Sequence, residues 1–161
     1  GHNLPVHMPQ LVANMFHLIG DLERIGDHAI NILEKTENCV QNRLIYSDVA
    51  RAELKEIYEV DLLLYDRAYS GYLCHSLTEQ DALELHRLED KIDAMTRKSE
   101  NNHIARLRAK QCHTQPGIVF AEALHDYERV GDHANDIVWI ARKNAQISGG
   151  MRLPVLSTDV V

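Results

Sequence analysis

Residues 21–32 read Asp-Leu-Glu-Arg-Ile-Gly-Asp-His-Ala-Ile-Asn-Ile, and residues 126–137 read Asp-Tyr-Glu-Arg-Val-Gly-Asp-His-Ala-Asn-Asp-Ile. Eight of the twelve positions are identical, and the two segments are 105 residues apart. Packing of a helix against a core would repeat only the apolar positions, but here the acidic residues, the arginine and the histidine also recur. We therefore predict that these segments, the first and second motif, are equivalent helices that meet their surroundings in the same way.

Apolar residues around the first motif recur in alternating steps of four and three, which predicts one long helix over about 9–40. The row consists of Leu11, Met15, Leu18, Leu22, Ile25, Ala29 and Ile32. Similar patterns predict helices over about 45–74, 78–112 and 117–146. The third row meets Ser99 and Asn102, so we expect a break, kink or local readjustment near 99–102. Short connections between long helices favour an all-α fold, an up-and-down antiparallel bundle of four long helices.

The length of 161 residues fits one domain, which we place at 1–146, followed by a flexible C-terminal tail at 147–161. The formal net charge of −7 argues against nucleic acid as a partner. Three cysteines without a Cys-x-x-Cys pair fit reduced thiols in the cytosol better than a disulfide framework. No apolar run approaches the ~20 residues that cross a bilayer, and the N-terminus does not look like a signal peptide.

Each motif places acidic side chains four residues apart along one side of its predicted helix. The stripe of the first motif consists of Glu23, Asp27 and Asn31, and that of the second of Glu128, Asp132 and Asp136. At about 100° per residue, both stripes lie on the flank or the outside of the bundle. Carboxylates at i and i+4 repel each other, so each stripe calls for a compensating positive charge.

Two kinds of compensation are open. Arg24 and Arg129 each lie three residues from an acidic residue on either side. The alternative is a bound cation, since clustered carboxylates suit Fe, Mn, Mg, Zn or Ca, and the duplication of the stripe favours a metal. On the third and second predicted helices, three more acidic residues could complete a carboxylate cluster or simply be solvated: Glu89, Asp93 and Asp61. The motif histidines, His28 and His133, point away from the stripes and are interpreted as surface or interface residues.

Gly26 and Gly131 occupy the same motif position, and each costs its helix about 1 kcal/mol relative to alanine. We interpret both as points where another helix approaches closely. A di-iron enzyme is a competing hypothesis, because four-helix bundles host such centres through two Glu-x-x-His pairs. The chain contains Glu100-x-x-His103 and Glu122-x-x-His125. The first pair lies at the expected break, and His125 points away from the bundle axis. No hydrolase, P-loop or dinucleotide motif is present, so we expect no catalytic residue.

The two motifs resemble those of the PhoU family, whose helical bundles carry Glu/Asp-x-x-x-Asp within a Glu-Arg-Ile-Gly-Asp stretch. A second stretch, Asn102-His103-Ile104-Ala105-Arg106-Leu107, precedes Cys112, Gly117 and Phe120. It looks like the C-terminal PhoU-like domain of bacterial sodium–phosphate cotransporter family proteins. The resemblance covers about residues 9–146. A full PhoU protein has two three-helix units, and this chain starts at the motif-bearing helix of the first unit, without the two helices before it.

The resemblance implies a regulatory domain linked to phosphate transport and homeostasis, located in the cytoplasm at the inner face of the membrane. Its expected partner is a membrane transport domain of the same or an associated protein, and a homodimer is a further candidate. By residue match, the family's metal ligands carry over to Glu23, Asp27, Glu128 and Asp132, with Asn31, Asp136, Glu89 and Asp93 as secondary candidates. An adaptor that uses the motifs for helix contacts without metal is the runner-up hypothesis.

Overall fold

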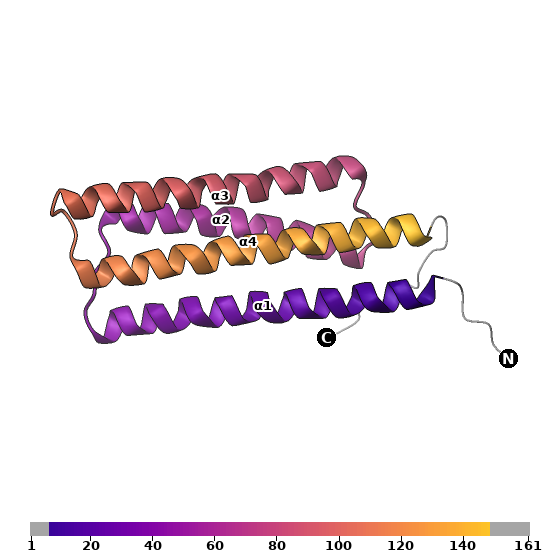
Figure 1. Cartoon of the computed structure of the whole chain (residues 1–161), viewed down its shortest axis with the longest axis horizontal. Coiled ribbons are helices and arrows are strands. Elements are labelled where there is room, and N and C mark those ends of the chain that lie inside the picture. The colour runs from indigo at the N-terminus through magenta and orange to yellow at the C-terminus, as the bar shows by residue number, and fades with distance from the viewer. Residues whose placement is uncertain (1–6, 149–161) are drawn as a thin grey trace.

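The computed structural model describes residues 7–148, and this part of the chain folds into helices joined by short turns (Figure 1). The helices are α1 (Met8–Gln41), α2 (Asp48–Leu73), α3 (Glu79–Arg108) and α4 (Thr114–Ser148). Consecutive helices run in opposite directions, as the colours of Figure 1 show. The predicted all-α fold of four long helices is confirmed. The predicted tail at 147–161 begins within the last turn of α4, and the remainder of it lies outside the described residues.

Local sequence explains where the helices begin. Pro9 lies in the first turn of α1, where its missing N–H is not needed. Ser47 caps α2 by accepting a hydrogen bond from the Ala50 backbone N–H at 3.2 Å. Thr78 and Asp81 form a capping box at the start of α3, in which each side chain accepts a hydrogen bond from the other's backbone N–H.

Of the break, kink or local readjustment expected near 99–102, the break is wrong, because α3 is continuous from Glu79 to Arg108. Small or hydrogen-bonded polar residues continue its packed face where the apolar row ends. Ser99 is buried, and Asn102 donates a hydrogen bond to Glu53 of α2 at 2.8 Å. A polar residue at the packed face therefore does not end a helix when it is small or has a partner.

The four helices do not have equivalent surroundings. α4 packs against α1, α2 and α3, and α2 also packs against α3, whereas α1 packs against α4 alone. Figure 1 shows α1 along one side of α4, with α2 and α3 on the other side. The centre of the core consists of fully buried residues from α2, α3 and α4: Ile57, Leu64, Leu85, Ile92, Phe120, Leu124, Ile137 and Val138. The second motif thus lies on the central helix and the first on a peripheral one.

Candidate functional site

The two motifs face each other across the interface of α1 and α4, which run antiparallel. His28 Nδ1 lies 2.8 Å from Asp126 Oδ1, and His133 Nδ1 lies 3.1 Å from Asp21 Oδ1. The first residue of each motif thus pairs with the histidine of the other, and the two imidazole rings stack with 6.0 Å between their centroids. The pairs are related by an approximate two-fold axis. These reciprocal pairs explain why the polar residues of the two motifs recur in register. They also place His28 and His133 in a helix interface, which was one of the two interpretations of these histidines, surface or interface.

One of these two pairs has additional donors. Asp126 is buried, and it also accepts hydrogen bonds from Asn31 at 3.3 Å and from the Lys35 ammonium at 2.7 Å. Burial raises the pKa of Asp126, but the hydrogen bonds from Lys35, His28 and Asn31 outweigh burial and lower that pKa overall. The placement of Asn31 in an exposed acidic stripe is therefore wrong, because its amide faces α4.

The glycine of the motif has different roles in the two helices. A Cβ atom at Gly131 would lie 3.1 Å from Asp61 Oδ1 and 3.1 Å from Ile92 Cδ1, so α2 and α3 approach this point closely, as predicted. A Cβ atom at Gly26 would meet nothing within 4 Å. The interpretation of Gly26 as a close-approach point is wrong, because α1 has no helix on that side.

Alanine at these two positions is expected to change stability in opposite directions. Gly26→Ala should raise the free energy of unfolding by about 1 kcal/mol, the difference in helix propensity. Gly131→Ala gains the same propensity but crowds the fully buried Ile92, and overpacking of this kind typically costs about 1–3 kcal/mol. Urea denaturation of both variants measures the difference. Equal changes in the two variants would contradict the structure.

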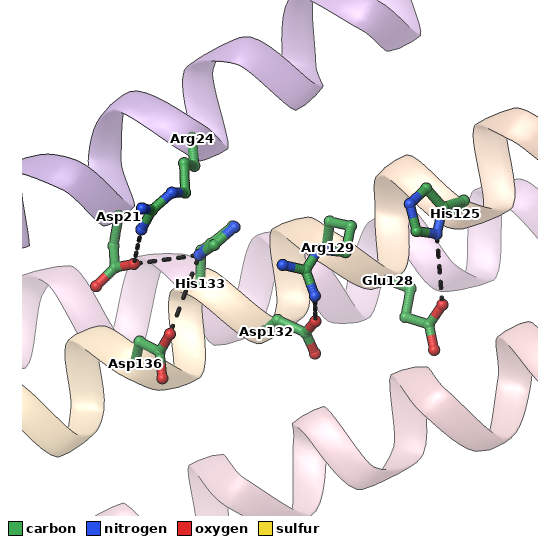
Figure 2. A network of polar contacts seen from close by, with 8 residues as sticks. All are labelled: Asp21, Arg24, His125, Glu128, Arg129, Asp132, His133 and Asp136. Atoms are coloured by element: carbon green, nitrogen blue, oxygen red, sulfur yellow. Dashed lines mark hydrogen bonds and ion pairs between the residues drawn. The ribbon is translucent and has the colours of Figure 1, made fainter.

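Glu128 and Asp132, the Glu-x-x-x-Asp pair of the second motif, face α3 and point away from α1 (Figure 2). One carboxylate oxygen each from Asp132, Glu89 and Asp93 lie within 4.8 Å of one another. Together with Glu128, these three residues form a partly buried group that we name the α3–α4 acidic cluster. The structure therefore brings the Glu-x-x-x-Asp pairs of α3 and α4 together.

The α3–α4 acidic cluster is only partly neutralised by its neighbours. Arg129 pairs with Asp132 at 2.6 Å, and Arg97 pairs with Asp93 at 3.6 Å. Burial raises the pKa of Glu89, and the charge of Asp93 raises it further. Burial also raises the pKa of Glu128, followed by the charges of Asp93 and Asp132. The charges of Asp93 and Asp132 thus disfavour ionisation of Glu89 and Glu128, and a cation between these carboxylates would relieve the repulsion.

The acidic residues of the first motif do not join the cluster. Glu23 and Asp27 are exposed on α1, which does not contact α3, and neither forms an ion pair within residues 7–148. Arg24 pairs with Asp21 at 3.4 Å and not with Asp27. Arg129 therefore neutralises an aspartate of its acidic stripe, as one of the two alternatives expected, whereas Arg24 pairs with Asp21, which lies outside the stripe of the first motif.

Asp61 of α2 lies on the other side of Gly131 and has no counterion. Its side chain is 3% exposed, and neither carboxylate oxygen has a hydrogen-bond partner among the described residues. Burial and, next, the charge of Asp132 raise the pKa of Asp61 to about 8. It is not among the carboxylates that lie within 4.8 Å of one another, so Asp61 is not a member of the cluster, although the charge of Asp132 acts on it.

Comparison of the sequence with known protein families identifies the domain that contains the α3–α4 acidic cluster. The model of the PhoU domain matches residues 54–141, more than half of the chain. This chain belongs to the PhoU domain family. The matched segment contains most of α2, all of α3 and most of α4, and thus the whole α3–α4 acidic cluster. The first motif, on α1, lies outside the matched part of the PhoU domain.

A curated relative extends the match. The phosphate-specific transport system accessory protein PhoU homolog 1 of Thermotoga maritima is 31% identical to this chain over 120 residues. The alignment covers 73% of the chain and 49% of the relative, so the chain spans about half the length of the PhoU relative it matches. No solved structure matches the chain. Within residues 7–148, every helix is too polar or has too short an apolar stretch to span a lipid bilayer.

α1, which lies outside the matched PhoU segment, has exposed apolar side chains along one face. Positions 105 residues apart correspond through the motifs, and three corresponding pairs are Met15 and Phe120, Ile19 and Leu124, and Leu33 and Val138. The α4 members are at most 1% exposed, whereas the α1 members are 47–56% exposed. The sequence of α1 thus resembles that of a central helix, although among the four described helices only α4 packs against it.

The geometry excludes the di-iron arrangement predicted as an alternative. Glu100, Glu122 and His125 are exposed, so the two Glu-x-x-His pairs do not share an inward-facing centre. His103 is buried instead at one end of the PhoU bundle, where its Nδ1 lies 4.0 Å from Cys112 Sγ. Burial and then the charge of Arg106 lower the pKa of His103.

The sequence did not predict the contacts around His103 at this end of the bundle. A Cβ atom at Gly117 would lie 2.7 Å from the His103 ring, so the glycine makes room for the histidine. Arg106 donates two hydrogen bonds to Glu53, at 3.2 and 2.9 Å. Five of the residues that carried the cotransporter-type resemblance therefore line a cavity of about 180 Å³ at this end of the bundle: His103, Arg106, Cys112, Gly117 and Phe120.

Proposed function

We propose that this PhoU domain is a regulator of phosphate transport that acts on a membrane transport domain from the cytoplasmic side, and that it binds a metal ion between α3 and α4. The metal proposal rests on one observation, the meeting of Glu89, Asp93 and Asp132 within 4.8 Å. The transport proposal is supported by the PhoU family match and by the name of the Thermotoga maritima relative, an accessory protein of a phosphate-specific transport system. The stretch 102–107 favours a sodium–phosphate cotransporter as the partner.

The donor set of the α3–α4 acidic cluster fits a hard or borderline cation. Four carboxylates, with Glu128 as the fourth, offer oxygen ligands of the kind that Mg²⁺, Mn²⁺, Ca²⁺ and iron prefer. Two arginines neutralise only part of this charge. On α1, Glu23 and Asp27 supply two of the four carboxylates of such a donor set. A metal site on α1 would therefore require a partner helix that contributes two more carboxylates.

Metal binding is expected to depend on the second motif and not on the first. Asp132→Ala should weaken Mn²⁺ binding by roughly tenfold or more, since it removes a carboxylate at the centre of the cluster. Asp27→Ala is the matched control, because it removes the same motif position on α1, where no other carboxylates assemble. Calorimetric titration of chelator-treated protein with Mn²⁺ measures both. Equal affinities in all three proteins, or no binding by the wild type, would remove the metal proposal.

The transport role is tested by phosphate uptake in cells that produce the natural protein or lack it. We expect uptake at high external phosphate to be restrained only when the PhoU domain is present. Uptake that is the same in both cell types, at low and high phosphate, would contradict a regulatory role. The result does not depend on metal binding, so the two parts of the proposal are separable.

The adaptor hypothesis remains as a second candidate because the motif arginines form ion pairs. If Arg129 serves only to hold helices, Arg129→Ala should lower stability or disturb assembly, and added metal should not change the result. If a metal occupies the cluster, Arg129→Ala should increase the affinity for Mn²⁺, because a competing cation has been removed from Asp132.

A further inference from the structure

The two ends of the α1–α4 interface differ in a way that points to a second cation site. The motif pairs Asp126 and His28 at one end with Asp21 and His133 at the other. At the first end the Lys35 ammonium lies 2.7 Å from Asp126 Oδ2, with its side chain 21% exposed. At this end, the Lys35 side chain therefore supplies the cation that neutralises Asp126.

At the other end the cation is missing. The position that corresponds to Lys35, 105 residues later, is Ile140, and the position that corresponds to Asn31 is Asp136. Exchange of the lysine for an apolar residue and of the amide for a carboxylate makes this end more negative by two charges. The interface is thus neutral at one end and contains two carboxylates, Asp21 and Asp136, at the other.

Neighbouring basic groups compensate these two carboxylates only in part, since Arg24 pairs with Asp21 and both His133 and Arg129 act on Asp136. Arg24 Nη1 lies 3.4 Å from Asp21 Oδ1, but its side chain is 61% exposed. The His133 imidazole lies 4.0 Å from the Asp136 carboxylate. Burial raises the pKa of Asp136, and the charge of Asp21 raises it further, which agrees with an excess of negative charge here.

Three potential ligand atoms lie close enough together to reach one metal ion. Asp21, His133 and Asp136 each place one ligand atom within 4.8 Å of the other two. His133 Nδ1 lies 3.1 Å from Asp21 Oδ1 and 4.0 Å from Asp136 Oδ2 (Figure 2). Neighbouring ligand atoms around tetrahedral Zn²⁺ are about 3.3 Å apart, given bonds of about 2.0–2.1 Å. Asp21 and His133 are close to this spacing, and the Asp136 oxygen is farther away, at 4.0 Å from His133 Nδ1, on a side chain that is 57% exposed.

We propose that Asp21, His133 and Asp136 bind one divalent transition-metal ion, of which Zn²⁺ is the type, at the position that Lys35 fills at the opposite end of the interface. The two side chains nearest each other are 7% exposed, which gives the ion a dry inner side. Asp136 opens the outer side, so the fourth position is left to water. The imidazole ligand and the α1 carboxylate distinguish this site from the α3–α4 acidic cluster.

The consequence is a metal-dependent attachment of α1. Because α1 contacts α4 alone, an ion shared by Asp21 of α1 and two residues of α4 would bind only when the helices are together. Zn²⁺ is therefore expected to slow amide hydrogen exchange in α1 more than in α2 or α3.

Exchange of the differing residues between the two ends tests the site. The probe is Zn²⁺ alone, titrated by calorimetry into chelator-treated protein carrying Glu89→Ala and Asp93→Ala, which removes the α3 half of the acidic cluster. In this background, Asn31→Asp with Lys35→Ile should gain one bound Zn²⁺. Asp136→Asn with Ile140→Lys should lose the one that is present. If the Ile140→Lys change unfolds the protein, as helix content by circular dichroism would show, Asp136→Ala keeps the test, with an expected loss of affinity of roughly tenfold or more.

The ligand is identified by the ¹⁵N resonances of the His133 ring, which should shift on Zn²⁺ addition in the Glu89→Ala/Asp93→Ala protein and stay unchanged after Asp136→Ala. Unchanged His133 resonances, or complete loss of Zn²⁺ binding on removal of Glu89 and Asp93 alone, would overturn the proposal and leave the α3–α4 site intact. Full binding by the Glu89→Ala/Asp93→Ala protein and none after Asp136→Ala would support it and count against the α3–α4 site.

Discussion

Asp61→Asn is expected to raise the free energy of unfolding by on the order of 5 kcal/mol above pH 8 and to change it little near pH 4. Asp61 is the one acidic side chain of α2 that is buried without any hydrogen-bond partner among residues 7–148. Its pKa is about 8 in the folded protein and about 3.8 in the unfolded chain. The folded state therefore keeps a proton that the unfolded state releases above pH 4.

The sign follows from linkage. Stability is greatest below the unfolded pKa and falls by about 1.4 kcal/mol per pH unit as the pH rises toward 8. Asparagine does not ionise, so it should remove this slope. Urea denaturation of wild type and Asp61→Asn at intervals from pH 4 to 9 measures the difference between the two profiles. The exposed Asp66 lies on the same helix, and Asp66→Asn is the control that should keep the wild-type slope.

Parallel stability profiles for wild type and Asp61→Asn would show that Asp61 is solvated or paired in solution. The same measurement with saturating Mn²⁺ also informs on the neighbouring cluster. The negative charge of Asp132 is one cause of the raised pKa of Asp61. A cation bound at Asp132 should therefore lower that pKa and flatten the wild-type profile.

Asp126→Ala is expected to release α1 from the rest of the domain. Asp126 is 4% exposed and accepts hydrogen bonds from His28, Asn31 and Lys35 of α1. Removal of one partner from a buried ionic network costs roughly 3–5 kcal/mol, and here the groups that lose their partner are partly buried, so we expect a loss toward the lower end of this range. Since α1 contacts only α4, most of this loss should appear as local opening of α1.

Amide hydrogen exchange measures the effect segment by segment. Protection in α1 should fall by about a hundredfold or more, which corresponds to about 3 kcal/mol, while protection in α2 and α3 is kept. Asp27→Ala, an exposed motif aspartate on α1, is the control and should change nothing. Because the pKa of Asp126 is lowered in the folded state, its contribution is present above the unfolded-state pKa and is lost as the pH falls below about 3.8. Uniform loss of protection in all helices would contradict a separable α1.

The sequence predicted which residues form the candidate site better than it predicted which of them lie together. It indicated Glu128, Asp132, Glu89 and Asp93 as carboxylates that could meet, and the structure brings the α3 and α4 pairs together. It treated Glu23 and Asp27 as equivalents of Glu128 and Asp132, but only the α4 pair faces other carboxylates. The repeated sequence could not reveal this difference, because it lies in the number of neighbouring helices.

Helix positions are local properties, and the sequence by itself determined them. Hydrogen bonds join residues four apart and side chains recur every 100°, so apolar spacing and capping residues were enough to place α1 to α4. Contacts such as Asp21 with His133 join residues 112 positions apart, and only the tertiary structure decided them. Two nearly identical motifs acquire different environments because α4 is covered by three helices and α1 by one, and the burial and charge at each site depend on those neighbours.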